Sequence, residues 1–367
     1  MPTDAEVLAD EARLVNLQYV AHRADEVIGK TKSLFSDAKY AGTARTLKYA
    51  WTNAPGFDAW AETTGGDAPV DRIVISYDAA VEIYRDAVVL PQFCVQHFNT
   101  DQYAMMYEPL AYGDGTRCVL PVELAPEEAT TRIMNSVLAW LYLHEQSHLF
   151  QNHGVVAATL KASWANADNK IDEMRDSKGA LLTGASAALS HVCELAADHE
   201  ATNNIVGLIM AANGGVIPAH SLWTLAAGLT CMFERFYGTD DRVYSADVNG
   251  SHPDPSFRLR ILLRNLGLLM LHPNVSKTAP WMAKREDFEA VVNHAVLTAT
   301  MYCHIRYREK EGISPFFPGV QGYSEVPHAY RQALFDMWLT ARPLILKHYC
   351  GWGEECVIKI PTNAYLS

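Results

Sequence analysis

Apolar residues recur at near-helical spacing through the N-terminal part of the chain. Between residues 4 and 50 they alternate with charged residues, as on one face of an amphipathic helix (Leu8, Leu14, Leu17, Val20 and Val27). Two stretches rich in glycine and proline, residues 53–56 and 65–69, interrupt this pattern and indicate loops. The pattern therefore predicts an N-terminal helical segment over residues 1–69.

After residue 70 the apolar runs become shorter and strand-like. The sequence Gly113-Asp114-Gly115 is a typical hairpin turn between two such runs. Strands are predicted at 72–77, 88–97, 104–107 and 118–122, with a short helix at 79–87. We expect a small antiparallel sheet, whose exposed edge could accept an extended peptide as an added strand.

Long helical patterns dominate the rest of the chain. Pro126, followed by two acidic residues, is typical of a helix N-terminus, and Gly154 is typical of a helix stop. Further helices are predicted at 185–210, 222–237, 258–271, 284–311 and 328–348, with a last strand at 357–360.

The expected fold class is α+β and predominantly helical, with the small antiparallel sheet preceding the helix that begins at Pro126. We expect residues 70–275 to form the core of the protein. Residues 276–367 are then a C-terminal helical region packed on that core.

Charge and hydropathy argue against two classes of partner. The 367 residues carry 30 Lys and Arg against 42 Asp and Glu, a net charge of -12, without a basic run. Nucleic acid and anionic membrane surfaces are therefore not expected as partners. The most apolar region, residues 205–232, is interrupted by Asn213, two glycines and Pro218, so it falls short of a membrane span of about 20 residues.

The cysteines and the N-terminus predict a cytoplasmic location. The 7 cysteines are scattered, odd in number and without a C-x-x-C pair, as expected of reduced thiols rather than a disulfide framework. The first residues are acidic and lack the apolar core of a signal peptide.

His144, Glu145 and His148 form an H-E-x-x-H motif inside a predicted helix. Their spacing puts both imidazoles on one helix face, where two ring nitrogens can bind Zn²⁺ beside a glutamate able to act as general base. With 14 histidines in the chain, a chance match is the alternative. The residues before the motif are apolar at helical spacing (Ile133, Val137, Trp140 and Leu141), so the motif would be buried. A metal would then compensate the cost of burying two histidines and a glutamate.

A second helical stretch carries Glu194 and Asp198, four residues apart and hence on one face. Glu194 is our candidate for the third zinc ligand, and Asp198 for the acceptor of a histidine ring N–H. A solvated acidic face is the alternative, but the neighbouring residues are apolar. His191 lies on the same face and is the rival third ligand.

His252, on a proline-rich loop, precedes Arg258 on a predicted helix. A histidine and an arginine so placed could stabilise the oxyanion that forms when a carbonyl is attacked. The alternative is an ordinary turn followed by a helix start.

Three segments together resemble the motifs of gluzincin metallopeptidases: LAWLYLHEQSH, CELAADHEA and GSHPDPSFRLRIL. Their spacing is similar to that of the Lit peptidase family. The resemblance spans about residues 138–263 and implies a zincin-like core. One departure is Leu259, where the family has Ile after the arginine.

The resemblance also implies a role for each matching residue. His144, His148 and Glu194 would bind Zn²⁺, Glu145 would be the general base, and Asp198 would hold a ligand. His252 and Arg258 fall on the family's H-P…R element. Lit peptidases cleave a translation elongation factor in phage exclusion, so the resemblance implies such a protein substrate and a role in phage defence.

The sequence therefore predicts a zinc-dependent endopeptidase that hydrolyses a cytosolic protein. A first alternative is a sensor or toxin-neutralising module that uses zinc only as a structural staple. The glutamate beside the candidate ligands argues against it, because a closed structural site has no use for a base. A second alternative is a helical interaction protein without metal.

Overall fold

The computed structural model describes residues 16–64, 69–95, 120–121, 123–161, 171–172, 182–237, 246–306, 316, 320 and 326–350. This part of the chain is predominantly helical with one small sheet, which confirms the α+β expectation. The helices are α2 (Leu17–Phe35), α3 (Asp37–Tyr40), α4 (Tyr77–Phe93), α6 (Pro126–Phe150), α7 (His153–Thr159), α8 (Gly184–Ala212), α9 (Ala219–Tyr237), α10 (Pro255–Met270), α11 (Pro273–Ser276), α12 (Arg285–Arg306) and α14 (His328–His348).

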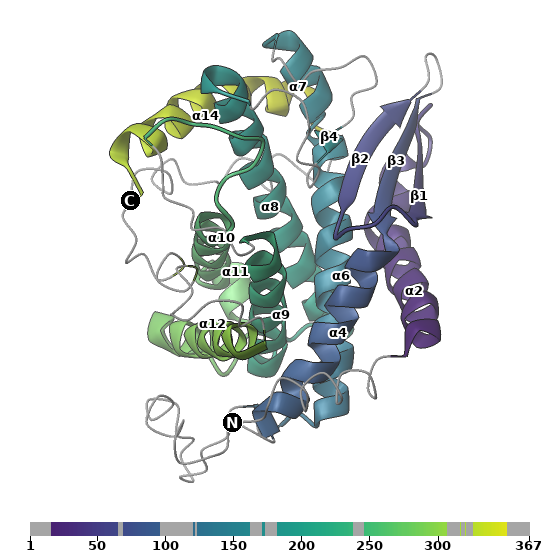
Figure 1. Ribbon diagram of the computed structural model, residues 1–367, viewed down its shortest axis with the longest axis vertical. Coiled ribbons are helices and arrows are strands. Elements are labelled where there is room, and N and C mark those ends of the chain that lie inside the picture. The colour runs from purple at the N-terminus through teal and green to yellow at the C-terminus, as the bar shows by residue number, and fades with distance from the viewer. Residues whose placement is uncertain are drawn as a thin grey trace.

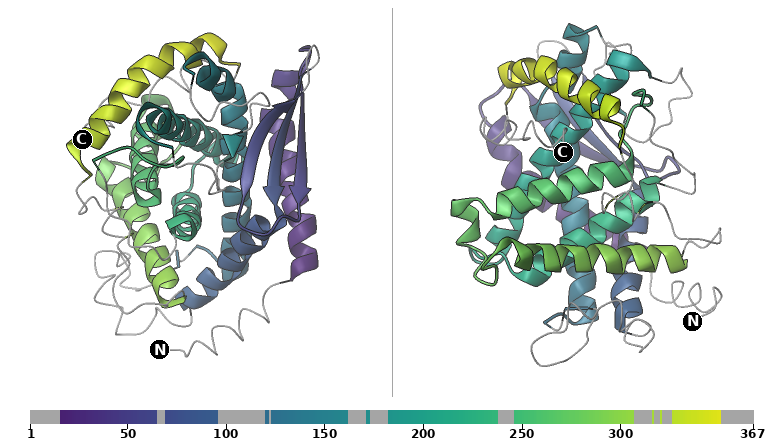
Figure 2. Two further views of the ribbon diagram at one scale, coloured as in Figure 1. Left: turned by 45° about the horizontal axis from the view of Figure 1, so that its top comes forward. Right: turned by 90° about the vertical axis from the view of Figure 1, so that its left-hand side faces the viewer.

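Helices α6 and α8 run side by side through the middle of the molecule (Figure 1). The sheet and α2 lie on one side of this pair, and α9, α10 and α12 lie on the other (Figure 2). Helix α14 crosses α8 at the end of the molecule where α7 lies. The two central helices are thus covered by other elements, and polar side chains that they turn toward each other are removed from solvent.

Helix α6 is buried on all sides in its second half. Every residue from 137 to 150 is buried, because α2, α4, α8, α9 and the sheet all pack on it. The helix begins at Pro126 as predicted and ends at Phe150. The predicted stop at Gly154 is wrong, because Gly154 lies within α7. The chain turns instead at Asn152, whose left-handed φ of 49° is tolerated by Asn better than by most residues.

The sheet is mixed rather than antiparallel. Strand β3 lies between β1 and β2, and it is antiparallel to β2 but parallel to β1. Strands joined by short connections reverse direction in turn, so when the third strand enters between the first two it must run parallel to the first. The strands are β1 (Thr46–Thr52), β2 (Ala59–Thr64), β3 (Val70–Ser76) and β4 (Ile171–Asp172).

Two sequence predictions are corrected here, and two others fall wholly or almost wholly on residues that the structure does not describe. The segment 1–69 is not simply helical, because it contributes β1 and β2 to the sheet that β3 completes. The run from residue 88 to 93 continues helix α4 rather than forming a strand. An apolar run buried from several sides has no period that separates strand from helix. The predicted hairpin at 104–122 lies almost entirely outside the described residues, as does the strand at 357–360.

The most apolar part of the chain is divided between two helices. Helix α8 ends at Ala212 and α9 begins at Ala219, with Gly214 and Gly215 in the left-handed region between them. Within the described parts of the chain, no helix combines the length and apolar character needed to cross a membrane.

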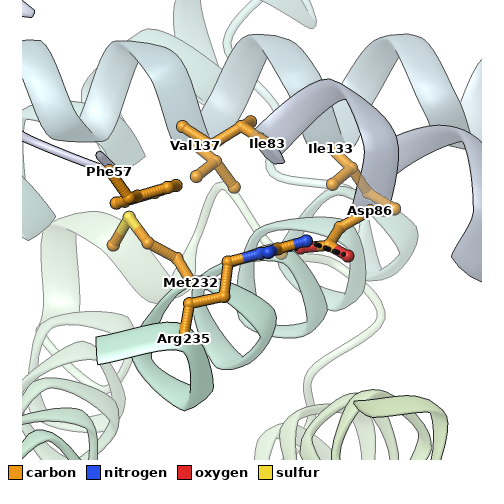
Figure 3. Close-up of a pocket in the computed structure, with 8 residues that line it drawn as sticks. Phe57, Ile83, Asp86, Ile133, Val137, Met232 and Arg235 are labelled. Carbon is orange, nitrogen blue, oxygen red and sulfur yellow. Dashed lines mark hydrogen bonds and ion pairs between the residues drawn. The ribbon is translucent and has the colours of Figure 1, made fainter. Parts of the chain in front are cut away.

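One hydrophobic core joins residues from both sides of position 69, from Val20 in α2 to Cys303 in α12. Helix α9 approaches α6 so closely that a Cβ added at Gly228 would lie 2.5 Å from Val137 and 2.9 Å from Ile133. Next to this contact is a small pocket, shown in Figure 3 and lined by Phe57, Ile83, Asp86, Ile133, Val137, Gly228, Met232 and Arg235.

An ion-pair cluster beside the pocket ties α4 to α9 and α12. Asp86 is buried and accepts hydrogen bonds from Arg235 at 2.7 and 3.0 Å (Figure 3). It also accepts one from Tyr302 at 3.0 Å and pairs with Arg306. Burial alone would raise the pKa of Asp86, but the two arginines outweigh it and hold the pKa below its ordinary value. The buried carboxylate of Asp86 is thus fully paired, and the cluster has a structural role: it joins α4 to α9 and α12.

Candidate metal centre

Helix α6 places His144 and His148 one turn apart on the face that meets α8. The two Nε2 atoms are 3.1 Å apart, and both side chains are buried. Glu194 of α8 completes a triangle, because its carboxylate oxygens lie 3.6 Å from Nε2 of His144 and 3.6 Å from Nε2 of His148. Within the described residues, these three form the group whose ligand atoms converge closely enough to hold a metal ion.

The size of this triangle fits a tetrahedral zinc site. Ligand atoms about 2.0–2.1 Å from a tetrahedral zinc lie roughly 3.4 Å from one another. The observed separations are 3.1, 3.6 and 3.6 Å. Three groups that present lone pairs to one buried point would repel one another, so a cation at that point is the natural compensation.

Asp198 holds the first of the two histidines. It lies one turn after Glu194 on α8, and its Oδ1 is 2.9 Å from Nδ1 of His144. A carboxylate accepts there, so Nδ1 carries the hydrogen and Nε2 presents its lone pair to the triangle. The indole of Trp140 stacks on the same imidazole, with ring centroids 5.2 Å apart. The orientation of His144 is therefore fixed by both contacts.

Arg258 forms a bidentate ion pair with Asp198. Its Nε and one terminal nitrogen donate to the two carboxylate oxygens at 2.9 and 2.7 Å, and the latter nitrogen is 3.3 Å from Glu194. Burial alone would raise the pKa of Asp198, but Arg258 and His144 outweigh it, so the pKa lies below its ordinary value. From its sequence position Arg258 was a candidate to stabilise an oxyanion; in the structure its guanidinium contacts Asp198 and Glu194.

Arg258 reaches this position because α10 packs against α8. Phe257 and Ile261, on either side of it, are buried in the same core cluster as the apolar residues of α8. Asp254 begins the helix, because its side chain accepts hydrogen bonds from the backbone N–H groups of Ser256 and Phe257. Leu259, the departure from the family motif, is buried within the helix.

Glu145 lies between the two candidate ligands on α6 and is fully buried. Its neighbours along the helix, from residue 137 to 150, are buried as well. A carboxylate at such a position is shielded from bulk water, a setting in which general bases are commonly found.

His191, the rival ligand, is turned toward helix α14. Its Nδ1 is 2.9 Å from the hydroxyl of Tyr330, and it is not a member of the converging group. The pKa of His191 is lowered to about 3, first by burial and then by the nearby charge of His252.

His252 lies on the loop before α10, half-buried, with its Nδ1 2.7 Å from the hydroxyl of Ser251. This loop is held against the start of α8, because the Ser190 hydroxyl donates to the Ser251 carbonyl at 2.6 Å and the Gly250 N–H donates to the Leu182 carbonyl. His252 therefore lies near His191, and the structure does not bring it into the converging group of three.

His148, the second candidate ligand, contacts a histidine that no sequence motif singled out. Nδ1 of His148 is 2.7 Å from Nδ1 of His153, the first residue of α7. His153 in turn contacts Gln151, which donates a hydrogen bond to Glu200 on α8. All four residues are buried. The only sequence signal was the polar run Gln151-Asn152-His153 shortly after the motif, and such a run is equally typical of a loop.

Glu200→Gln is expected to change how stability depends on pH. Burial raises the pKa of Glu200 from 4.5 to about 7, opposed by hydrogen bonds from Gln151 and Tyr349 and by the charge of Lys39; Cys350 also faces it. The folded protein therefore holds one proton more than the unfolded chain between these two values, and its stability falls as pH rises through that window. The loss amounts to roughly 3 kcal/mol at about 1.4 kcal/mol per pKa unit.

Denaturant unfolding of wild type and variant at pH 5 and pH 8 measures this effect. The stability of Glu200→Gln relative to wild type should be higher at pH 8 than at pH 5. The same substitution at the exposed Glu128 of α6 is the control and should give no such difference. Identical pH dependence in wild type and Glu200→Gln would contradict the raised pKa.

Comparison of the chain with protein-family models, curated proteins and solved structures found no match. The gluzincin resemblance accordingly rests on the motif residues themselves.

Proposed function

We propose that this chain is a zinc-dependent endopeptidase that acts on a cytosolic protein. The observation that carries the proposal is the buried convergence of His144, His148 and Glu194, with Glu145 between the two histidines on the same helix. Two histidines and one carboxylate leave an open coordination position, which catalytic zinc sites need and closed structural sites lack.

When bound, zinc would supply Lewis acidity toward the scissile carbonyl and toward a water molecule. Glu145 would take a proton from the attacking water and deliver it to the leaving amine nitrogen. His252 would donate a hydrogen bond to the carbonyl oxygen as negative charge develops on it. Asp198 would hold His144 in its binding tautomer, and Arg258 would position Asp198.

Two alternatives make different predictions. A zinc-stapled sensor or interaction module would bind the metal but show no turnover, although the described donors number three rather than the four of a closed site. A helical interaction protein without metal would bind no zinc. Metal analysis of the purified protein separates this second alternative from the other two.

A search for cleaved proteins tests the function directly. Cells expressing wild type or Glu145→Gln would be compared by labelling and sequencing newly formed protein N-termini. We expect N-termini that appear with wild type only. The motif resemblance implies a translation elongation factor among the substrates, as in phage defence. Identical sets of N-termini in the two samples would refute the peptidase proposal.

Asp198→Asn should weaken zinc affinity or turnover about 10- to 100-fold, as changes to groups that orient a metal ligand usually do. Asparagine can still accept from His144, but it removes the negative charge that Arg258 contacts at 2.7 and 2.9 Å and leaves only Glu194, at 3.3 Å, to balance the buried guanidinium. Competition with a chelator measures the affinity. Asp336→Asn, at an exposed position on α14, is the control. Unchanged affinity together with unchanged turnover would contradict the assignment.

His252→Ala should lower kcat by about 10²- to 10³-fold, the usual effect of removing one oxyanion donor. Zinc content, KM and melting temperature should change little, because the donor acts in the transition state. Ser251→Ala removes only its hydrogen-bond partner and should have a smaller effect. Loss of zinc would make His252 a ligand, and a lower melting temperature with normal turnover would make the loop structural.

A further inference from the structure

A continuous chain of buried hydrogen bonds leads away from His148. It passes from Nδ1 of His148 to Nδ1 of His153 at 2.7 Å, and from Nε2 of His153 to Oε1 of Gln151 at 2.9 Å. Nε2 of Gln151 then donates to Glu200 at 2.8 Å. The other oxygen of Glu200 accepts from the hydroxyl of Tyr349 at 2.8 Å. The chain therefore joins α6, α7 and α8 to the residue after α14.

The orientation of the Gln151 amide is fixed at the far end of this chain. Its nitrogen faces two acceptors, the carboxylate of Glu200 at 2.8 Å and the carbonyl of Ala196 at 3.1 Å. Only the NH₂ group can satisfy two acceptors, so the amide cannot be flipped without placing oxygen against oxygen. Its Oε1 must therefore face His153, and an amide oxygen can only accept.

This orientation determines the hydrogen on each imidazole in turn. Nε2 of His153 must carry a hydrogen in order to donate to Gln151. A neutral imidazole carries one ring hydrogen, so Nδ1 of His153 is then the acceptor in its 2.7 Å contact with His148. Nδ1 of His148 must donate to it and carries the hydrogen. The lone pair of His148 is left on Nε2, the atom that faces His144 and Glu194.

We propose that Gln151 and Glu200, acting through His153, are positioning residues that hold His148 in the tautomer competent to bind metal. The inference rests on the proposed metal site but not on the proposed reaction. The tautomer of each candidate histidine is then set by a different group: Asp198 sets that of His144, and the hydrogen bonds that lead from Glu200 set that of His148.

Further hydrogen bonds join the end of α14 to the end of α6 beside this series of side chains. Besides the Tyr349 hydroxyl, the N–H of Cys350 donates to the carbonyl of Phe150, and the side chain of Asn152 donates to the carbonyl of His348. These bonds hold the turn between α6 and α7, which presents His153 to His148. The C-terminal helix thus contributes to the site without supplying one of the three converging groups.

The tautomer of His148 in the metal-free protein is the decisive measurement. Two-bond nitrogen–hydrogen correlations of ¹⁵N-histidine-labelled protein at pH 8 distinguish Nδ1–H from Nε2–H, and a His148 substitution assigns the signal. We expect Nδ1–H in wild type. In Gln151→Leu we expect Nε2–H, because His153 is released and the lone pair of His144, 3.1 Å away, becomes the better acceptor.

Affinity for Zn²⁺ alone, measured against a competing chelator, gives the second readout. Gln151→Leu should bind about 10- to 100-fold more weakly. Glu200→Leu should lose about 10-fold, because the Ala196 carbonyl still accepts from Gln151 in that variant. Glu200→Gln retains an acceptor for Gln151 and should stay within about threefold of wild type. Tyr349→Phe leaves the bonds nearer His148 in place and should also change little. If Gln151→Leu does not fold, the comparison of Glu200→Leu with Glu200→Gln carries the test.

Asp86→Asn is the matched control for general destabilisation, because it replaces a buried, hydrogen-bonded carboxylate in another cluster and weakens the ion pairs there. It should leave both the tautomer and the zinc affinity unchanged. Wild-type His148 with hydrogen on Nε2 alone, or an unchanged tautomer and affinity in the leucine variants, would overturn the proposal. Failure of wild type to bind zinc would refute the proposed function instead, and the tautomer measurement would still decide this inference.

Discussion

Glu145→Gln is expected to keep the metal and lose the activity. Glutamine has almost the same shape as glutamate, so α6 and both candidate ligands should stay in place. It cannot take up a proton from water, and loss of a general base typically lowers the rate by about 10²- to 10⁴-fold. The fall should appear in kcat and kcat/KM alike, since the base acts in the chemical step.

Three measurements on the purified variant test this expectation. Elemental analysis should give one zinc per chain, as in wild type, and the melting temperature should be close to the wild-type value. Hydrolysis of a substrate found in the search for cleaved proteins should be reduced by orders of magnitude. Glu128→Gln, the same substitution at an exposed position of the same helix, should be fully active. A Glu145→Gln variant that hydrolyses at the wild-type rate would refute the mechanism.

Removal of a converging group should abolish most of the zinc binding. His144→Ala, His148→Ala and Glu194→Ala each remove one of the three groups that meet at the buried point. The loss should exceed the roughly 10- to 100-fold expected for the residues that only orient a ligand. Zinc should also raise the melting temperature of wild type, by the equivalent of about 2.7 kcal/mol at 100 times the dissociation constant. In the three variants this rise should disappear.

Two other buried histidines serve as controls. His294 accepts a hydrogen bond from Trp223, and His191 contacts Tyr330. Neither histidine belongs to the converging group of three, so alanine at either position should leave zinc binding intact. Full zinc occupancy in Glu194→Ala combined with loss of zinc in His191→Ala would show that the third ligand was wrongly assigned.

Much of the candidate centre follows from patterns within single helices. His144 and His148, and likewise Glu194 and Asp198, are four residues apart, and a helix brings such residues onto one face whatever surrounds it. The major helices were predicted close to their observed bounds for the same reason. A helix is built from hydrogen bonds between near neighbours in the chain, so its presence and its faces are recorded locally.

Contacts between different helices and strands could not be predicted from such local patterns. Arg258 could have faced a substrate or a carboxylate, and only the packing of α10 on α8 places it on Asp198. The apolar run at 88–93 became helical because α4 packs against α6. The sheet is mixed because the third strand enters between the first two.

For the two histidines of the motif, the sequence and the tertiary structure determined different properties. The sequence alone determined that His144 and His148 share a helix face, because the spacing of four is a property of the backbone. Which ring nitrogen of each presents its lone pair was decided by Asp198 on one side and by His153, Gln151 and Glu200 on the other. Asp198 is 54 residues from His144 along the chain and Glu200 is 52 residues from His148, and a hydrogen bond forms only where the fold brings donor and acceptor within about 3 Å.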